Sequence, residues 1–315
     1  MIDLNAAARR YPSVLVIGGT GFIGAHLVAR LAAAGRRVIV PTRHASRSHR
    51  LSVLPTVEVV EADVHDVTVL TGLMARCNAV INLVGILHSR PGPTGSRYGQ
   101  AFARAHVELP KKIASACLAA GVERYLHMSA LGALVHGSSM YLRSKADGEA
   151  AVRDIIPAAT IFQPSVVFGP QDQFLNLFAS LQQFFPVMPL GGAEARFQPV
   201  YVGDVAQAFV NALEHPVTFG KTYQLGGPTV YTLRQLVMLA GEWSGHRRPI
   251  IGLPPLLARL QAFALEWVPG GPLMSRDNLD SMRQDNILSA PIDAELRMIP
   301  AALETHAPAY LARRA

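Results

Sequence analysis

Short apolar runs alternate with amphipathic segments along the first half of the chain. Residues 14–17 are continuously apolar, as is typical of a strand buried on both faces, and glycines follow before an amphipathic segment over about residues 23–34. The pattern continues with predicted strands at 37–40, 57–61, 79–84, 125–129 and 159–162 and predicted helices at 66–77, 100–120 and 141–154. This alternation predicts an α/β fold with a Rossmann-type, doubly wound parallel sheet.

The texture of the sequence changes after Pro164. Proline, glycine and aromatic residues become more frequent, and the predicted helices become shorter. We therefore expect an NAD(P)-binding domain over residues 12–165 and a smaller C-terminal, substrate-side lobe over residues 166–315. Segments near 198–226 are expected to return to the sheet of the first domain.

An apolar stripe in this second lobe allows two interpretations. It consists of Leu256, Leu257, Leu260, Phe263, Ala264 and Trp267. Such a stripe can touch a membrane or a partner, but more often it is core, and we favour core.

Composition narrows the classes of function. The 315 residues are 50% hydrophobic and 16% charged, which suits a globular protein with a large core. The net charge of +7 comes from scattered arginines, so nucleic acid is not expected as a partner. No metal site is predicted, because the chain has no HxxxH, HExxH or CxxC pattern. His106 and His127 are expected in the core or near the cofactor, and Cys77 and Cys117 as buried thiols.

The first twelve residues carry no apolar run behind a charged start, so no signal peptide is predicted. No run of 18 apolar residues is present, so no spanning helix is expected either. We expect a cytoplasmic protein, or one held at the periphery of a membrane complex.

The most specific motif is the glycine-rich turn after the first strand. A strand, then Gly18-x-x-Gly21-x-x-Gly24, then a helix is the context of dinucleotide binding. Gly18 permits the tight turn, Gly21 lets the backbone approach the pyrophosphate, and Gly24 lets helix and strand pack closely. The diphosphate then meets the free N–H groups at the start of the helix. The predicted contacts in this turn are Gly18, Thr20, Gly21, Phe22, Ile23 and Gly24.

The end of the second strand indicates which dinucleotide is bound. A carboxylate there would bind the ribose 2′-hydroxyl of NAD, but the chain has Pro41-Thr42-Arg43-His44, with Arg47 close behind. The guanidinium of Arg43 suits a 2′-phosphate by charge and geometry, so NADP(H) is favoured and NAD is the alternative. Arg43 could also be a solvated loop charge.

Further cofactor contacts are predicted after the other strands. Asp63 follows the third strand, where it either accepts a hydrogen bond from the adenine amino group or caps the next helix. The remaining predicted contacts are Val64, Val84, Gly85, Lys145, Pro164 and Val166.

Three residues carry candidate chemistry. Tyr141 and Lys145 are four positions apart on a predicted helix and share one face. The ammonium is expected to lower the phenol pKa, which makes Tyr141 a general acid or base, and Lys145 can also hold the nicotinamide ribose. Ser129 ends the fifth strand, where ligands bind in such sheets, and can bond a substrate carbonyl or hydroxyl. The alternative is a surface tyrosine beside a solvated lysine.

Over about residues 12–230 the chain resembles the extended and atypical short-chain dehydrogenases/reductases, which include nucleotide-sugar epimerases and dehydratases. The glycine turn, Asp63, residues 82–85, Ser129 and the Tyr141/Lys145 pair carry the resemblance. It leaves three functions open: an oxidoreductase acting on an unidentified carbonyl or alcohol substrate that is small or lipid-like, an epimerase or dehydratase, and a non-catalytic nucleotide-binding subunit.

Residues 141–149, 164–176 and 276–286 are similar to one subgroup, that of the NADPH-binding accessory subunit of respiratory complex I and its bacterial relatives. This resemblance implies tightly held NADP(H) and a respiratory or membrane-complex partner, and family members often pair as homodimers. One departure is Gln163-Pro164, where relatives often carry Arg-Pro.

Overall fold

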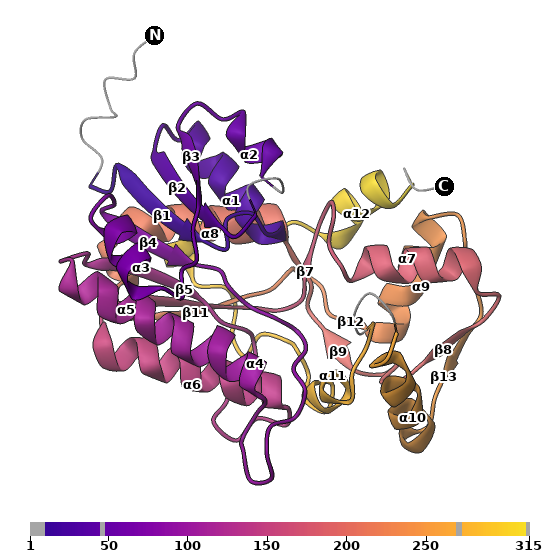
Figure 1. The fold of residues 1–315 in the computed structure, drawn as a ribbon. Coiled ribbons are helices and arrows are strands. Elements are labelled where there is room, and N and C mark those ends of the chain that lie inside the picture. Colours follow the sequence, from indigo (N-terminus) through magenta and orange to yellow (C-terminus); the bar gives the residue numbers. More distant parts are fainter. Residues whose placement is uncertain (1–9, 45–47, 269–272, 313–315) are drawn as a thin grey trace.

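The apolar run predicted as the first strand forms β1 (Ser13–Ile17), at the centre of a parallel sheet (Figure 1). In this computed structural model, which describes residues 10–44, 48–268 and 273–312, the sheet has seven strands in the order β11–β6–β5–β4–β1–β2–β3. The predicted Rossmann-type, doubly wound sheet is thereby confirmed. Its other strands are β2 (Arg37–Thr42), β3 (Val57–Glu61), β4 (Ala79–Asn82), β5 (Arg124–Met128), β6 (Thr160–Pro164) and β11 (Thr222–Leu225).

Helices cover both faces of the sheet, because successive side chains of β1 point to opposite sides. Val14 and Val16 pack with α1 and α8 in one core, and Leu15 and Ile17 pack with α3 and α5 in the other. Cys77 and Cys117 are free thiols buried in the second core, as predicted. The helices of this lobe are α1 (Phe22–Ala33), α2 (His49–Ser52), α3 (Val67–Met74), α4 (Gln100–Phe102), α5 (Leu109–Ala119), α6 (Met140–Ile155) and α8 (Val202–Glu214).

The helix predicted over residues 100–120 is not uniform. A π-helical turn, η3 (Ala103–Glu108), separates α4 from α5 and carries His106 into the protein interior. Helix α6 packs directly on this turn, since a Cβ added to Gly148 would lie only 1.9 Å from the His106 carbonyl oxygen. The prediction of an unbroken α-helix was wrong. A single π-helical turn does not change the spacing of apolar residues enough to be seen in the sequence.

The C-terminal lobe lies beside the carboxyl ends of the strands (Figure 1) and is built from helices and pairs of short strands. Its helices are α7 (Leu175–Phe184), α9 (Leu233–Trp243), α10 (Pro255–Leu265), α11 (Arg276–Ser281) and α12 (Leu303–Leu311). Its strand pairs are β7 (Val167–Phe168) with β10 (Val200–Tyr201), β8 (Met188–Leu190) with β13 (Ile250–Gly252), and β9 (Arg196–Phe197) with β12 (Tyr231–Thr232). The 3-10 turns are η4 (Pro216–Thr218) and η5 (Ala294–Leu296).

Helix α10 contradicts the favoured interpretation of the apolar stripe. Leu256, Leu260 and Trp267 are exposed to solvent, and the helix packs on its lobe through Ala258 and Ala262 instead. Spacing alone predicts that apolar residues share a face, but it cannot tell which face the lobe covers. Across the described ranges of the chain, no helix is both long and apolar enough to cross a bilayer.

Candidate functional site

The predicted site residues gather at one edge of the sheet. The glycine turn follows β1, Arg43 follows β2, Asp63 follows β3, Gly85 follows β4 and Ser129 follows β5. Because these strands are parallel, their carboxyl ends meet at a common edge, and the order of the strands reverses between β1 and β4. Ligands of doubly wound sheets bind in the crevice at such a switch point.

The glycine turn has the geometry of a diphosphate cradle. Gly18 has a φ of +85°, and the Gly21 amide donates to the Gly18 carbonyl oxygen at 3.1 Å. A Cβ on Gly24 would lie 2.3 Å from the same oxygen, so only glycine lets α1 start this close to β1. Thr20 lies in the turn, and Phe22 and Ile23 open the helix.

The backbone amides at the N-terminus of α1 have no side-chain hydrogen-bond acceptor within the helix. Gly21 is the N-cap and supplies no side-chain acceptor, and no acidic residue occupies the first turn. The amides at this end therefore have neither a capping oxygen nor a competing carboxylate, which fits an anionic group. These residues thus fit the diphosphate of a dinucleotide.

Arg43 lies on the surface just beyond β2 and makes no ion pair with any residue that the structure describes. Its guanidinium remains a candidate for a 2′-phosphate, and the solvated alternative remains open. Arg47, the second cation noted in the sequence, is outside the described residues.

The helix-capping alternative for Asp63 is not what the structure has. The N-cap of α3 is Asp66, whose carboxylate accepts from the amides of Thr68 and Val69. Asp63 instead accepts from the amide of His65 at 3.0 Å, which closes the turn after β3. Its role toward adenine stays a prediction, as does that of Val64, which packs against the core beside it.

The loops after β4 and β6 are held by amide side chains. Asn82 accepts from the Val84 amide at 3.1 Å, which shapes the turn into Gly85. Pro164 ends β6, and the Val166 amide after it donates to Asn286 at 3.1 Å. The contact from Asn286 crosses 120 residues of sequence.

Lys145 is the central charged group of the site. It is buried, its Nζ donates to the Met128 carbonyl oxygen at 3.1 Å, and a Cβ on Gly85 would lie 3.3 Å from this Nζ. Burial lowers the pKa of Lys145 to about 8, against a smaller opposing effect of Glu149. The solvated-lysine alternative is therefore wrong.

Ser129 is buried at the end of β5, next to Met128. Its hydroxyl makes no regular hydrogen bond, although the Glu149 carboxylate lies close enough to interact with it. Glu149 accepts from Gln163 at 2.8 Å, and burial raises the pKa of this carboxyl. A buried hydroxyl without a regular partner is costly, so it is suited to a ligand oxygen.

Tyr141 differs from the sequence-based expectation. Its ring lies edge-on to Phe102 and His106, with centroid distances of 6.0 and 5.6 Å. Burial raises the pKa of Tyr141 to about 12, whereas the sequence led us to expect a lowered phenol pKa. The physical reason is the burial of the phenol, which disfavours its charged form, and the Lys145 Nζ donates to the Met128 carbonyl oxygen instead.

Two buried histidines complete the interior of the site. His106 Nε2 accepts from the Ile86 amide at 3.0 Å, so its Nδ1 carries the proton shared with Ser144 Oγ at 2.8 Å. Burial, together with the nearby Lys145, lowers the pKa of His106 to about 2 and of His127 to about 3. Both imidazoles are neutral, and their burial confirms the prediction of a core or cofactor-proximal position.

Sequence reasoning missed a second acceptor at the start of α6, beside its N-cap Ser139, whose hydroxyl accepts from the Leu142 amide. Asp277, on α11 of the C-terminal lobe, accepts from the amides of Met140 at 2.7 Å and Tyr141 at 3.0 Å. The only earlier signal was the family-like segment 276–286, which carried no structural role.

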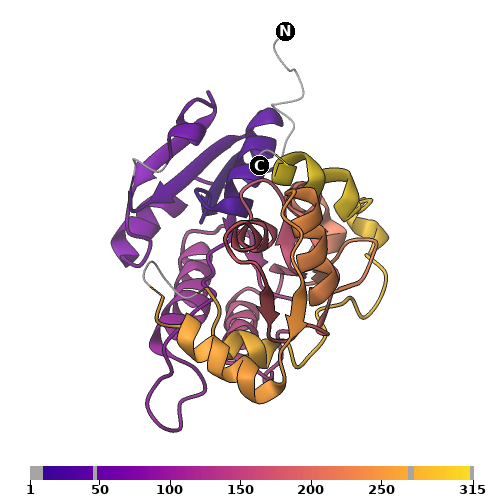
Figure 2. The same cartoon turned by 90° about the vertical axis from the view of Figure 1, so that its right-hand side faces the viewer.

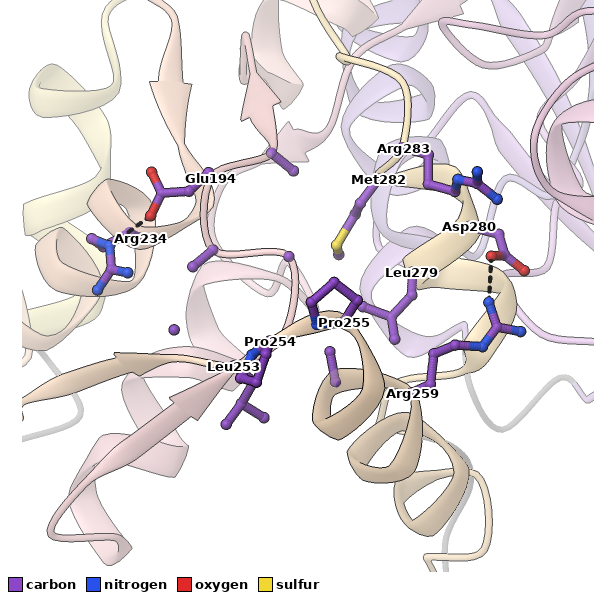
Figure 3. A pocket seen from close by; sticks show the side chains of 15 residues that line it. Glu194, Arg234, Leu253, Pro254, Pro255, Arg259, Leu279, Asp280, Met282 and Arg283 are labelled. Atoms are coloured by element: carbon purple, nitrogen blue, oxygen red, sulfur yellow. Dashed lines mark hydrogen bonds and ion pairs between the residues drawn. The ribbon is translucent and has the colours of Figure 1, made fainter.

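A cavity of about 830 Å³ lies in the C-terminal lobe between the end of β13, α10 and α11 (Figure 3). Arg234, Arg259 and Arg283 contribute to its wall, whereas Ser129, Tyr141 and Lys145 do not. It is therefore separate from the site at the sheet edge.

Comparison with known proteins decides the family. Residues 14–226 match the model of the NAD dependent epimerase/dehydratase family. The chain belongs to this family. The predicted class of cofactor, a nicotinamide dinucleotide, is thereby confirmed, and the choice between NADP and NAD is not.

The proteins similar to this chain carry names that describe different functions. The chain is 33% identical over 304 residues to the mouse (Mus musculus) NADH dehydrogenase [ubiquinone] 1 alpha subcomplex subunit 9, mitochondrial, covering 92% of this chain and 77% of the relative. It is 34% identical over 242 residues to the ceramide reductase of Caulobacter vibrioides, covering 76% and 73%. The structure of UDP-glucose 4-epimerase from Thermotoga maritima superposes with a TM-score of 0.67 at 18% identity, covering 96% of this chain and 98% of that one, and shows a shared fold.

Proposed function

We propose that this protein is an NADP(H)-dependent oxidoreductase that interconverts a carbonyl group and an alcohol. The observation that carries the proposal is the position of Lys145 on α6, one turn from Tyr141, beside the end of β5. Ser129 directly follows that strand, and its hydroxyl makes no regular hydrogen bond but lies close to the Glu149 carboxylate. A proton-transferring group, a cation and a second hydroxyl are the parts that hydride transfer to a carbonyl needs.

Each residue has a separate task. Bound NADP(H) supplies or takes up a hydride at nicotinamide C4. In reduction, Tyr141 gives its phenol proton to the carbonyl oxygen, and its pKa of about 12 keeps that proton in place at neutral pH. Ser129 donates a hydrogen bond to the same oxygen, and Lys145 holds the nicotinamide ribose. In oxidation, Tyr141 takes the proton back from the alcohol.

The identity of one relative supports an apolar substrate. A relative with 34% identity is named ceramide reductase. Ceramides are long-chain molecules with a hydroxyl group that forms when the corresponding ketone is reduced. We therefore assign the carbonyl to a long-chain, lipid-like molecule.

Isotope transfer tests the reaction directly. The protein is incubated with NADPH deuterated at C4 and with 3-ketoceramide as the probe, and the lipid product is analysed by mass spectrometry. Incorporation of one deuterium at the new alcohol carbon supports the proposal. An unlabelled lipid together with unoxidised NADPH contradicts it.

A second candidate is a nucleotide-holding subunit of a respiratory complex. The relatives from mouse, rat, Arabidopsis and Dictyostelium that carry the name of a mitochondrial NADH dehydrogenase subunit favour it. It predicts that NADP(H) co-purifies, survives dialysis and is not oxidised by the probe. Mass spectrometry of the released nucleotide, before and after dialysis, separates this candidate from an enzyme whose cofactor exchanges.

A further inference from the structure

Helix α10 carries large apolar side chains on the side that faces solvent. We call Leu256, Leu257, Leu260, Phe263 and Trp267 the α10 face; their exposed fractions are 81%, 48%, 63%, 45% and 71%. Four of them follow a spacing of four, three and four, so they form one stripe along the helix. The rings of Phe263 and Trp267 lie 6.5 Å apart and continue the stripe past the last turn.

The opposite side of the helix is what holds it to the lobe. Ala258 and Ala262 are buried, and a Cβ on Gly191 would lie 2.9 Å from the Ala258 Cβ. The small residues thus pack inward and the large ones point outward. A surface helix normally has the reverse arrangement, with its large apolar side chains packed against the core. In both views α10 lies at the outer edge of the C-terminal lobe (Figures 1 and 2).

The charges around the α10 face favour an anionic partner. Arg259 is the one charged residue within α10, and it pairs with Asp280 at 3.0 Å. The carboxylate of Glu266 is held by Arg276, whose guanidinium also lies 5.0 Å from the Phe263 ring centroid. These nearby carboxylates are therefore already paired.

A cation next to the same helix remains available. Arg283 lines the cavity next to α10 and forms no ion pair with any described residue (Figure 3). The whole chain carries a net charge of +7, so the long-range field has the same sign.

We infer that the α10 face docks this protein on an anionic phospholipid bilayer. The three leucines and Phe263 enter the boundary of the acyl chains, Trp267 lies at the level of the headgroups, and the flanking arginines contact lipid phosphates. Helix α10 lies in the plane of the interface. The inference rests on exposure and charge, and it holds whether or not the site at Tyr141 turns over a substrate.

A second copy of the chain is a poorer occupant. Specific protein interfaces involve ~20–30 residues on each side. The α10 face has five residues, four on a helix of 11 and Trp267 just beyond its end, and this narrow stripe is better suited to a lipid surface that adapts to it.

Trp267 makes the test direct, because the chain has only two tryptophans. The variant Trp243→Phe leaves Trp267 as the single tryptophan, whose fluorescence can be excited selectively. We expect its emission to shift to the blue and the protein to float with vesicles of phosphatidylcholine and phosphatidylglycerol. With phosphatidylcholine alone, the partition coefficient falls about tenfold, because the headgroup charges are lost.

A matched pair of variants locates the surface. Leu260→Glu lowers partitioning at least about tenfold, because an apolar anchor is replaced by a charge. Leu118→Glu changes an equally exposed leucine on α5 (66% against 63%) and leaves partitioning unchanged. Thermal unfolding of both variants confirms that the fold is intact.

Three results overturn the inference. One is an unchanged Trp267 spectrum with no flotation on either vesicle, and another is a Leu260→Glu variant that floats like the parent. The third is a blue shift that grows with protein concentration in the absence of vesicles and disappears in Leu260→Glu, which assigns the face to a second copy.

Discussion

The Asp277 carboxylate accepts a hydrogen bond from the backbone amide of Tyr141, across 136 residues of sequence. The same carboxylate accepts from Met140, so α11 of the C-terminal lobe adds to the cap that Ser139 supplies at the start of the helix with the proposed catalytic residues. The lobe therefore takes part in fixing where α6 begins.

We expect Asp277→Ala to lower the free energy of unfolding by about 1–2 kcal/mol, because two amides at a helix start lose their charged acceptor. Asp277→Asn keeps one acceptor oxygen and recovers part of the loss. Thermal or denaturant unfolding measures both. Asp280→Ala, on the same helix, removes only a partly exposed ion pair and is the control. Equal stability of Asp277→Ala and the parent would show that the cap is dispensable.

His106 is expected to position the loop after β4. Its ring joins the Ile86 amide to Ser144 on α6. His106→Ala leaves a partly buried amide without an acceptor and costs about 1–3 kcal/mol. We also expect weaker binding of NADPH, measured by fluorescence titration, because Gly85 loses its support. An unchanged dissociation constant for NADPH would show that His106 does not position this loop for cofactor binding.

Lys145 gives the site a pH dependence with a definite sign. Its folded pKa of about 8 lies below the ordinary value of 10.5, so between these pH values the unfolded chain binds the proton and the folded chain does not. Stability gained from this group therefore rises as pH increases through this window. Lys145→Met abolishes the rise in denaturant unfolding, and Lys111→Met, on the surface, keeps it. A parent protein whose stability is flat between pH 8 and 10 would contradict the lowered pKa.

Arg43 tests the choice of nucleotide. If its guanidinium holds the 2′-phosphate, Arg43→Ala raises the dissociation constant of NADPH about 10–100-fold and leaves that of NADH unchanged, because a charge-assisted contact is lost from one nucleotide only. Arg50→Ala removes another exposed arginine, on α2, and is the control. If the affinities for NADPH and NADH fall equally, or if neither falls, Arg43 does not bind the 2′-phosphate and is a solvated loop residue.

Local physics explains which features could be predicted from the sequence. The buried strands, the glycine turn and the shared face of Tyr141 and Lys145 depend on residues within a few positions of one another. The parallel sheet then brings the loops after the strands to one edge, which is why these candidates from distant segments gather there.

The features that could not be predicted depend on tertiary contacts. Asp277 and Asn286 reach α6 and the loop after β6 from more than 100 residues away, with no local pattern to mark them. The raised pKa of Tyr141 follows from the burial of its phenol in the folded protein, which the spacing of Tyr141 and Lys145 does not predict. The same holds for α10, whose alanines pack inward in place of its leucines.

The role of Tyr141 is tested most directly by comparing Tyr141→Phe with Tyr98→Phe. Tyr98 donates to Asp147 on the same helix, so the control removes a phenol hydroxyl outside the proposed machinery. NADPH oxidation with 3-ketoceramide and NADPH affinity are measured for each variant. We expect Tyr141→Phe to lose at least about 100-fold in kcat, as for a general acid, with NADPH affinity unchanged, and Tyr98→Phe to turn over like the parent. Full turnover by Tyr141→Phe would contradict the account.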